Sequence, residues 1–79
     1  MNKKVYNKVL SGKSDNNISF RDFEKLISDL GFSFQSQEGS HKTYSLKYIN
    51  ARITILPDGN KAHGYQIRII RNIIKKHNL

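Results

Sequence analysis

Residues 31–56, GFSFQSQEGSHKTYSLKYINARITIL, decide the fold, because their apolar side chains recur at every second position. Such alternation is typical of strands with one buried face. It predicts three strands, whose inward-facing residues are, in chain order, Phe32 and Phe34, then Tyr44, Leu46 and Tyr48, then Ile53 and Ile55. Glu38-Gly39 and Asn50 offer turns, and connections this short join antiparallel neighbours. The segment predicts an antiparallel meander that ends in a turn at residues 56–60, where Pro57 cannot donate to a ladder.

The residues on either side of the meander have the spacing of amphipathic helices. Ser19 is a candidate N-cap and Gly31 a candidate C′ residue, so one helix is predicted over residues 19–30. A shorter helix is predicted around residues 5–10, and a last one over residues 65–77. The last helix is expected to bury Tyr65, Ile69, Ile70, Ile73 and Ile74 and to expose Arg68, Arg71, Asn72, Lys75 and Lys76. The predicted core is drawn from Phe20, Phe23, Leu26, Leu30, Phe32, Ile69, Ile70, Ile73 and Ile74.

The predicted order of elements gives an α+β fold in a single domain over residues 1–79. Its helices pack on one face of a three-stranded sheet, an arrangement that resembles the double-stranded-RNA-binding fold. No stretch approaches the ~20 apolar residues that cross a bilayer, and the basic N-terminus is not followed by the apolar run of a signal peptide. We expect a protein of the cytoplasm.

The charge of the chain is strongly asymmetric. Its formal net charge is +8, and +7 of this lies from Gly39 onward, where Asp58 is the only acid. A one-sided excess in so small a chain favours a polyanionic partner, and nucleic acid is the commonest, because neutralised phosphates release counterions. Charge alone does not separate RNA from DNA or from an acidic protein.

Few side chains in this sequence can carry chemistry. Cysteine is absent, which excludes thiolate nucleophiles, disulfides and thiolate metal sites. The single acid after Glu38 argues against a Ser-His-Asp triad and against a carboxylate cluster for magnesium. The three histidines, His41, His63 and His77, lack the spacing and the fourth ligand of a zinc site. We expect neither a metal nor another cofactor.

His41 has the setting of a general acid or base. It follows Gly39-Ser40 at the mouth of the first predicted hairpin, and Lys42 is adjacent. Histidine titrates near neutral pH, which suits proton transfer. RNA supplies its own nucleophile, the 2′-hydroxyl, so an enzyme that cuts it needs an acid or base, positive charge and correct positioning. The alternative is an exposed histidine without a catalytic role.

Longer stretches of the chain resemble the HicA-like (YcfA-like) toxins. Gly31-Phe32 and the run GSHKTY at residues 39–44 resemble the family pattern GF…GSHxxY. LSGKSDNNISF at residues 10–20 and YQIR at residues 65–68 are similar to the lead-in and the YQVR of one branch, although His63-Gly64 replaces its Lys-Pro. The resemblance implies a double-stranded-RNA-binding-like fold, a ribonuclease toxin that cuts mRNA, and a HicB-type antitoxin as partner. It carries the catalytic histidine onto His41, with Gly39 and Ser40 as motif neighbours.

The predicted reaction is metal-independent transesterification. His41 would act on the 2′-hydroxyl, while Lys42 and the amides near Gly39 would stabilise the phosphate. The RNA strand would be held by five further basic residues, namely Lys47, Arg52, Lys61, Arg68 and Arg71. Two alternatives stay open: a non-catalytic module that binds duplex RNA by shape, and a domain whose basic surface docks an acidic protein.

Overall fold

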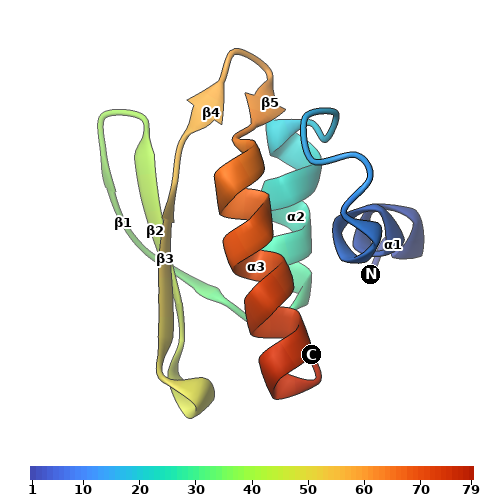
Figure 1. Ribbon diagram of the computed structural model, residues 1–79. Helices are drawn as coiled ribbons and strands as arrows, with labels where there is room; N and C mark the ends of the chain where they lie inside the picture. The colour runs from blue at the N-terminus through green and yellow to red at the C-terminus, as the bar shows by residue number, and fades with distance from the viewer.

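Three helices lie on one face of a three-stranded antiparallel sheet in the computed structural model, which describes residues 1–79 (Figure 1). The sheet has the order β1-β2-β3, with β1 (Ser33–Glu38), β2 (His41–Leu46) and β3 (Ala51–Ile55). The helices are α1 (Lys3–Ser11), α2 (Phe20–Asp29) and α3 (Gly64–His77). The predicted α+β class, the antiparallel meander and the additional N-terminal helix are confirmed.

The period-two pattern sets the two faces of the sheet. In β2 and β3 the side chains turned to the helices are buried, namely Tyr44, Leu46, Ile53 and Ile55. β2 and β3 pair in regular register, so that Thr43 faces Thr54 and Ser45 faces Arg52 on the opposite side of the sheet. The predicted second strand is too long, because the chain leaves it after Leu46 in the short 3₁₀ helix η1 (Lys47–Ile49). β1 is exposed along its whole length, and Phe34, which was predicted to face inward, is 54% exposed because β1 is an edge strand of the sheet. The sheet therefore has a buried apolar face over β2 and β3 and a polar face opposite to it.

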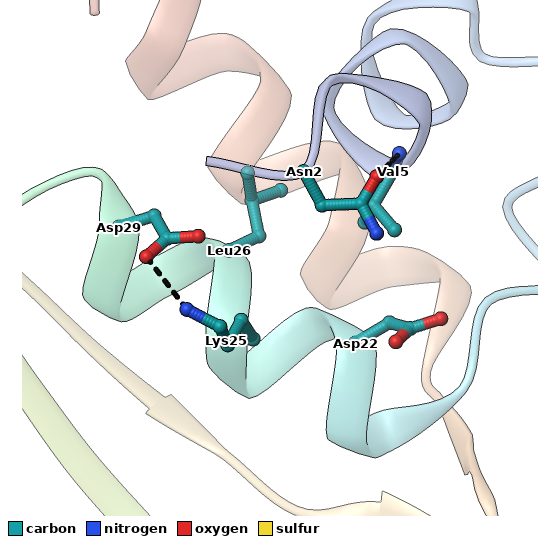
Figure 2. A pocket seen from close by; sticks show the side chains of 6 residues that line it. All are labelled: Asn2, Val5, Asp22, Lys25, Leu26 and Asp29. Carbon is teal, nitrogen blue, oxygen red and sulfur yellow. Dashed lines mark hydrogen bonds and ion pairs between the residues drawn. The ribbon is translucent and has the colours of Figure 1, made fainter.

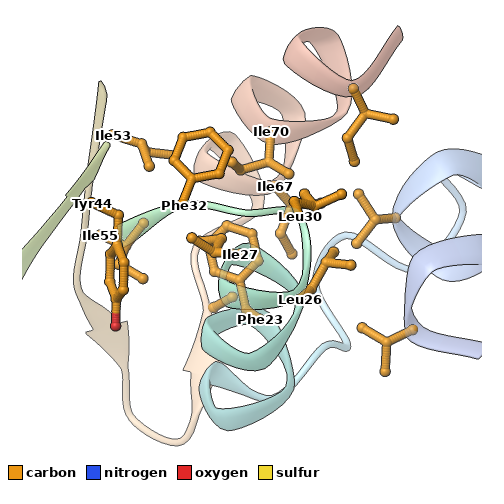
Figure 3. Close-up of a cluster of buried hydrophobic side chains, with 14 of the residues drawn as sticks. Phe23, Leu26, Ile27, Leu30, Phe32, Tyr44, Ile53, Ile55, Ile67 and Ile70 are labelled. Atoms are coloured by element: carbon orange, nitrogen blue, oxygen red, sulfur yellow. The ribbon is translucent and has the colours of Figure 1, made fainter. Parts of the chain in front are cut away.

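The core lies between the apolar face of the sheet and the helices (Figure 3). Ser19 begins α2 as predicted, since its hydroxyl accepts a hydrogen bond from the amide of Asp22 at 3.1 Å. Gly31, just after α2, has a φ of 105°, a conformation that L side chains rarely adopt. The fully buried residues include Phe23 and Ile27 of α2, Ile55 of β3, and Ile67 and Ile70 of α3.

The predicted apolar stripe of α3 is partly wrong. Tyr65 and Ile69 are 49% and 43% exposed, whereas Ile67 is fully buried beside Ile70 and Ile74. The buried isoleucines Ile67, Ile70 and Ile74 are spaced by three and four residues, so the buried side of α3 is rotated about the helix axis relative to the predicted one. Gln66, only 2% exposed, donates to the carbonyl of Thr54 and accepts from the amide of Leu56, so it ties the start of α3 to the end of β3.

Residues 57–62 form a small hairpin where only a turn was predicted. β4 (Pro57–Asp58) pairs with β5 (Lys61–Ala62), and Pro57 heads its strand, a position that proline tolerates. The hairpin also joins the entrance of α2, because the amide of Ala62 donates to the carbonyl of Ile18. It lies at the same end of the molecule as the β1–β2 turn (Figure 1). No helix of the chain has the length and apolar character that a membrane span requires.

Arg71 joins α3 to the N-terminal segment and does not face outward as predicted. Its guanidinium donates to both carboxylate oxygens of Asp15, at 2.9 and 3.0 Å, and to the carbonyl of Val9 at 3.0 Å. The hydrogen bond with Asp15 raises the pKa of Arg71. Gly12 ends α1 with a φ of 71°, and a Cβ atom there would lie 3.2 Å from Arg71 Nη1. Arg71 is therefore a structural residue in this fold.

Candidate functional site

A two-residue turn places His41 at the end of the sheet. Glu38 and His41 are the last paired residues of β1 and β2, and Gly39-Ser40 connects them. Gly39 has a φ of 59° while Ser40 does not have positive φ, which is the pattern of a type II′ turn with glycine in its first central position. A Cβ atom at Gly39 would meet nothing within 4 Å. The glycine is therefore required for its backbone conformation and not for close packing.

His41 is exposed on the polar face of the sheet, which no helix covers (Figure 1). It borders an open hollow of about 420 Å³ that is lined by Ser36, Glu38, His41, Thr43 and Thr54. The hydroxyls of Thr43 and Thr54 share a hydrogen bond of 2.9 Å across β2 and β3. All of these side chains can donate or accept hydrogen bonds, so the hollow suits a polar ligand.

Glu38 belongs to this site although sequence reasoning did not select it. It is the cross-strand partner of His41, and both side chains border the same hollow. Directly opposed residues of antiparallel strands have Cβ atoms about 4.5–5.5 Å apart. The signal was present in the sequence, because a two-residue turn at Gly39-Ser40 makes its flanking residues a pair. The site thus offers one imidazole and one carboxylate.

Lys42 lies on the other face of the sheet from His41, as neighbours in a strand do. Its ammonium donates to Glu24 of α2 at 2.8 Å, and the hydroxyl of Tyr44 donates to the same carboxylate oxygen at 3.1 Å. The hydrogen bond to Glu24 raises the pKa of Lys42, while burial and then the same carboxylate raise that of Tyr44. The prediction that Lys42 stabilises a phosphate beside His41 is therefore wrong.

The structure separates the basic residues that were predicted to hold RNA. Lys47 and Arg52 lie at the far end of the polar face and border a second hollow of about 350 Å³, together with Gln35, Ser45, Asn50 and Ala51. Lys61 is exposed on β5 and Arg68 is exposed on α3, both outside the polar face of the sheet. Arg71 is held by Asp15. Only Lys47 and Arg52 share a face with His41.

The other histidines do not join this site. His63 precedes α3 with its ring 5.4 Å from that of Tyr65, and His77 ends the same helix. No group of three or more His, Asp or Glu side chains is close enough to hold a metal ion. A hollow between α1 and α2, beside Asn2 and Asp29, measures about 10 Å³ and has room for about one water molecule (Figure 2). It is a packing feature next to the Lys25–Asp29 ion pair.

No family model, curated protein or solved structure matches the chain. His41 and Glu38 stand at one end of an uncovered polar sheet face, and two cations stand at the other end. This arrangement can exchange protons at one place and bind anionic groups at another.

Proposed function

We propose that the protein is an endoribonuclease that cleaves RNA by transesterification without a metal ion, with His41 as a catalytic acid or base. The observation that carries the proposal is the pairing of an exposed histidine with a carboxylate across the β1–β2 turn, in an open polar hollow. The strong positive charge of the chain favours a polyanionic substrate.

The reaction requires two proton transfers. A base removes the proton of the 2′-hydroxyl as its oxygen attacks the adjacent phosphorus, and an acid gives a proton to the departing 5′-oxygen. The products are a 2′,3′-cyclic phosphate and a 5′-hydroxyl end. Glu38 as the base and protonated His41 as the acid supply both transfers, and the imidazolium also offsets charge on the phosphorane. The hydroxyls of Thr43 and Thr54 border the same hollow, and the one that accepts in their shared hydrogen bond keeps its proton free to donate to a phosphate oxygen.

The biological role follows from the motif resemblance alone. Like the HicA-like toxins that residues 39–44 resemble, the protein would cut mRNA in the cytoplasm and arrest growth. A HicB-type antitoxin would neutralise it, by covering the polar face that carries His41. Co-expression with the product of the adjacent gene tests this role, since an antitoxin restores growth and co-purifies with the chain.

The chemistry is tested with purified protein and RNA in EDTA. We expect the wild type to cut RNA to 2′,3′-cyclic phosphate and 5′-hydroxyl ends, and His41→Ala and Glu38→Gln to lose about 10²–10⁴-fold in rate. His63→Ala is the matched control, because it removes a histidine outside the hollow, and it should retain activity. Products with 5′-phosphates that require magnesium, or full activity of His41→Ala, would contradict the proposal.

The second candidate is a non-catalytic RNA-binding module. Lys47 and Arg52 favour it, because they form a basic hollow distant from His41 that binding alone would use. In that case His41→Ala and the wild type bind RNA equally and neither cuts it. The same EDTA experiment therefore separates the two functions.

A further inference from the structure

We propose that the substrate is single-stranded RNA laid along the polar face of the sheet, with a phosphate held by Lys47 and Arg52 and a base stacked on Tyr48. The proposal rests on the proposed function, because it takes the scissile phosphate to lie at His41. It adds the strand state of the substrate and a second binding subsite at the opposite end of the sheet.

The polar face forms a continuous track between the two hollows. Starting from the Glu38–His41 pair, its next row holds Ser36, Thr43 and Thr54, and the row after that holds Ser45 opposite Arg52. Every side chain of these rows is polar, and the helices lie on the other side of the sheet (Figure 1). From His41 to Ser45 the strand rises about 13 Å, at about 3.3 Å per residue. A short extended run of nucleotides spans that distance.

Lys47 and Arg52 form an anion subsite at the far end of the track. Neither is in an ion pair; among the basic residues of the chain only Lys25, Lys42 and Arg71 have an acidic partner. No Asp or Glu side chain borders their hollow, and Gln35, Ser45 and Asn50 add polar atoms around it. Two unpaired cations in an open polar hollow suit a phosphate, which accepts hydrogen bonds from both. The subsite lies opposite the proton-transfer pair on the same face.

Tyr48 of η1 offers an exposed aromatic ring at this end of the sheet, although it does not itself line the hollow of Lys47 and Arg52. It is 75% exposed, the highest value among the exposed large hydrophobic residues, and it directly follows Lys47 in η1. An exposed ring beside cations that track a backbone is the usual platform for a base of a single strand. The polar rows of the sheet themselves carry no aromatic residue, so Tyr48 is the aromatic side chain next in the chain to the Lys47 end of these rows.

Both the track and the chemistry favour a single strand over a duplex. Transesterification requires the 2′-oxygen to stand in line with the departing 5′-oxygen, and a stacked A-form helix holds the sugar away from that alignment. A single strand can splay its bases, so that one stacks on Tyr48 while the backbone follows the sheet. A duplex would be recognised by its shape and could not place a base on the ring.

The test measures binding to the His41→Ala protein, which leaves the RNA uncut. The probe is a fluorescein-labelled single-stranded RNA of about 12 nucleotides, with the same sequence as a duplex for comparison. Lys47→Ala combined with Arg52→Ala should weaken binding of the single strand about tenfold. The slope of log K against log salt should fall by about 0.7, the contribution of one single-strand phosphate contact. Tyr48→Ala should weaken binding about fivefold, and Tyr48→Phe should restore it.

The matched control is Lys75→Ala combined with Lys76→Ala, which removes the same charge from the exposed end of α3. It should change binding less than twofold. Duplex affinity equal to or above that of the single strand, or an equal loss in the control, would overturn the proposal. Neither result would affect the proposed function, which the RNA cleavage assay of the wild type tests separately. Conversely, binding that depends on Lys47, Arg52 and Tyr48 supports the track even if the wild type cuts nothing.

Discussion

Removing the guanidinium of Arg71 should unfold the protein more readily and leave RNA binding unchanged. The side chains of Arg71 and Asp15 are only 14% and 15% exposed, and two hydrogen bonds of 2.9 and 3.0 Å join them. Arg71→Ala leaves the mostly buried carboxylate of Asp15 without its cationic partner and removes the donor to the carbonyl of Val9. Hydrogen bonds to charged groups contribute about 1.5–3 kcal/mol each. Because both groups keep some water contact, we expect a loss of about 2–3 kcal/mol in the free energy of unfolding.

This loss is large for a chain of 79 residues. Such domains have on the order of 5–10 kcal/mol of stability, and each kcal/mol corresponds to about 4–8 °C in Tm. Urea denaturation followed by circular dichroism measures it, and a cycle with Asp15→Ala should give a coupling of at least about 1.5 kcal/mol. Arg68→Ala is the control, because Arg68 is exposed on the same helix, and its change should stay within about 0.5 kcal/mol. An Arg71→Ala protein of unchanged stability that binds RNA about tenfold less tightly would refute the structural role.

Two further changes test the hairpin and the cluster on the helix side of the sheet. Gly39→Ala should lower the free energy of unfolding by about 1–2 kcal/mol and lower RNA cleavage, because φ at Gly39 is 59°. A synthetic chain with D-alanine at position 39 should behave as the wild type. Equal losses for L-alanine and D-alanine would contradict the turn assignment. The free energy of unfolding should be flat from pH 7 to about pH 9. It should fall as the pH rises past 10.0 and 10.5, the usual pKa values of Tyr44 and Lys42. The reason is that the fold raises both pKa values, so the folded protein retains protons that the unfolded chain loses. Urea denaturation against pH checks this, and Lys42→Met combined with Tyr44→Phe should flatten the alkaline fall.

The sheet and its capped helix could be predicted because their signals are local. Alternation through Tyr44 and Ile53 identifies the buried face of each strand, and the hydroxyl of Ser19 precedes an apolar run that needs a cap. The same alternation also assigns Lys42 to the buried side, two residues before Tyr44. Its adjacency to His41 in the sequence misled the prediction, since neighbours in a strand point to opposite faces.

The remaining differences depend on packing that no local pattern contains. Isoleucines in α3 are frequent enough to form two overlapping apolar rows, and only contact with the sheet and α2 selects Ile67 over Ile69. Arg71 finds its partner 56 positions away, in the loop after α1. In the sequence, Arg71 is therefore a candidate for binding RNA, whereas in the fold its guanidinium is bound to Asp15. Lys47 and Arg52 could be assigned to one site only after η1 and β3 were placed.

The apolar face of the sheet contributes to stability, and the polar face carries the proposed site. The apolar face contributes to the core, so a thin 79-residue domain cannot change Tyr44 or Ile55 without loss of stability. The polar face contributes no buried apolar side chain, so nothing in the packing requires a histidine at position 41 or an arginine at position 52. Substitution of His41 or Arg52 should leave the free energy of unfolding within about 0.5 kcal/mol of the wild type. A loss of RNA cleavage in His41→Ala can then be assigned to chemistry, because the folded population stays the same.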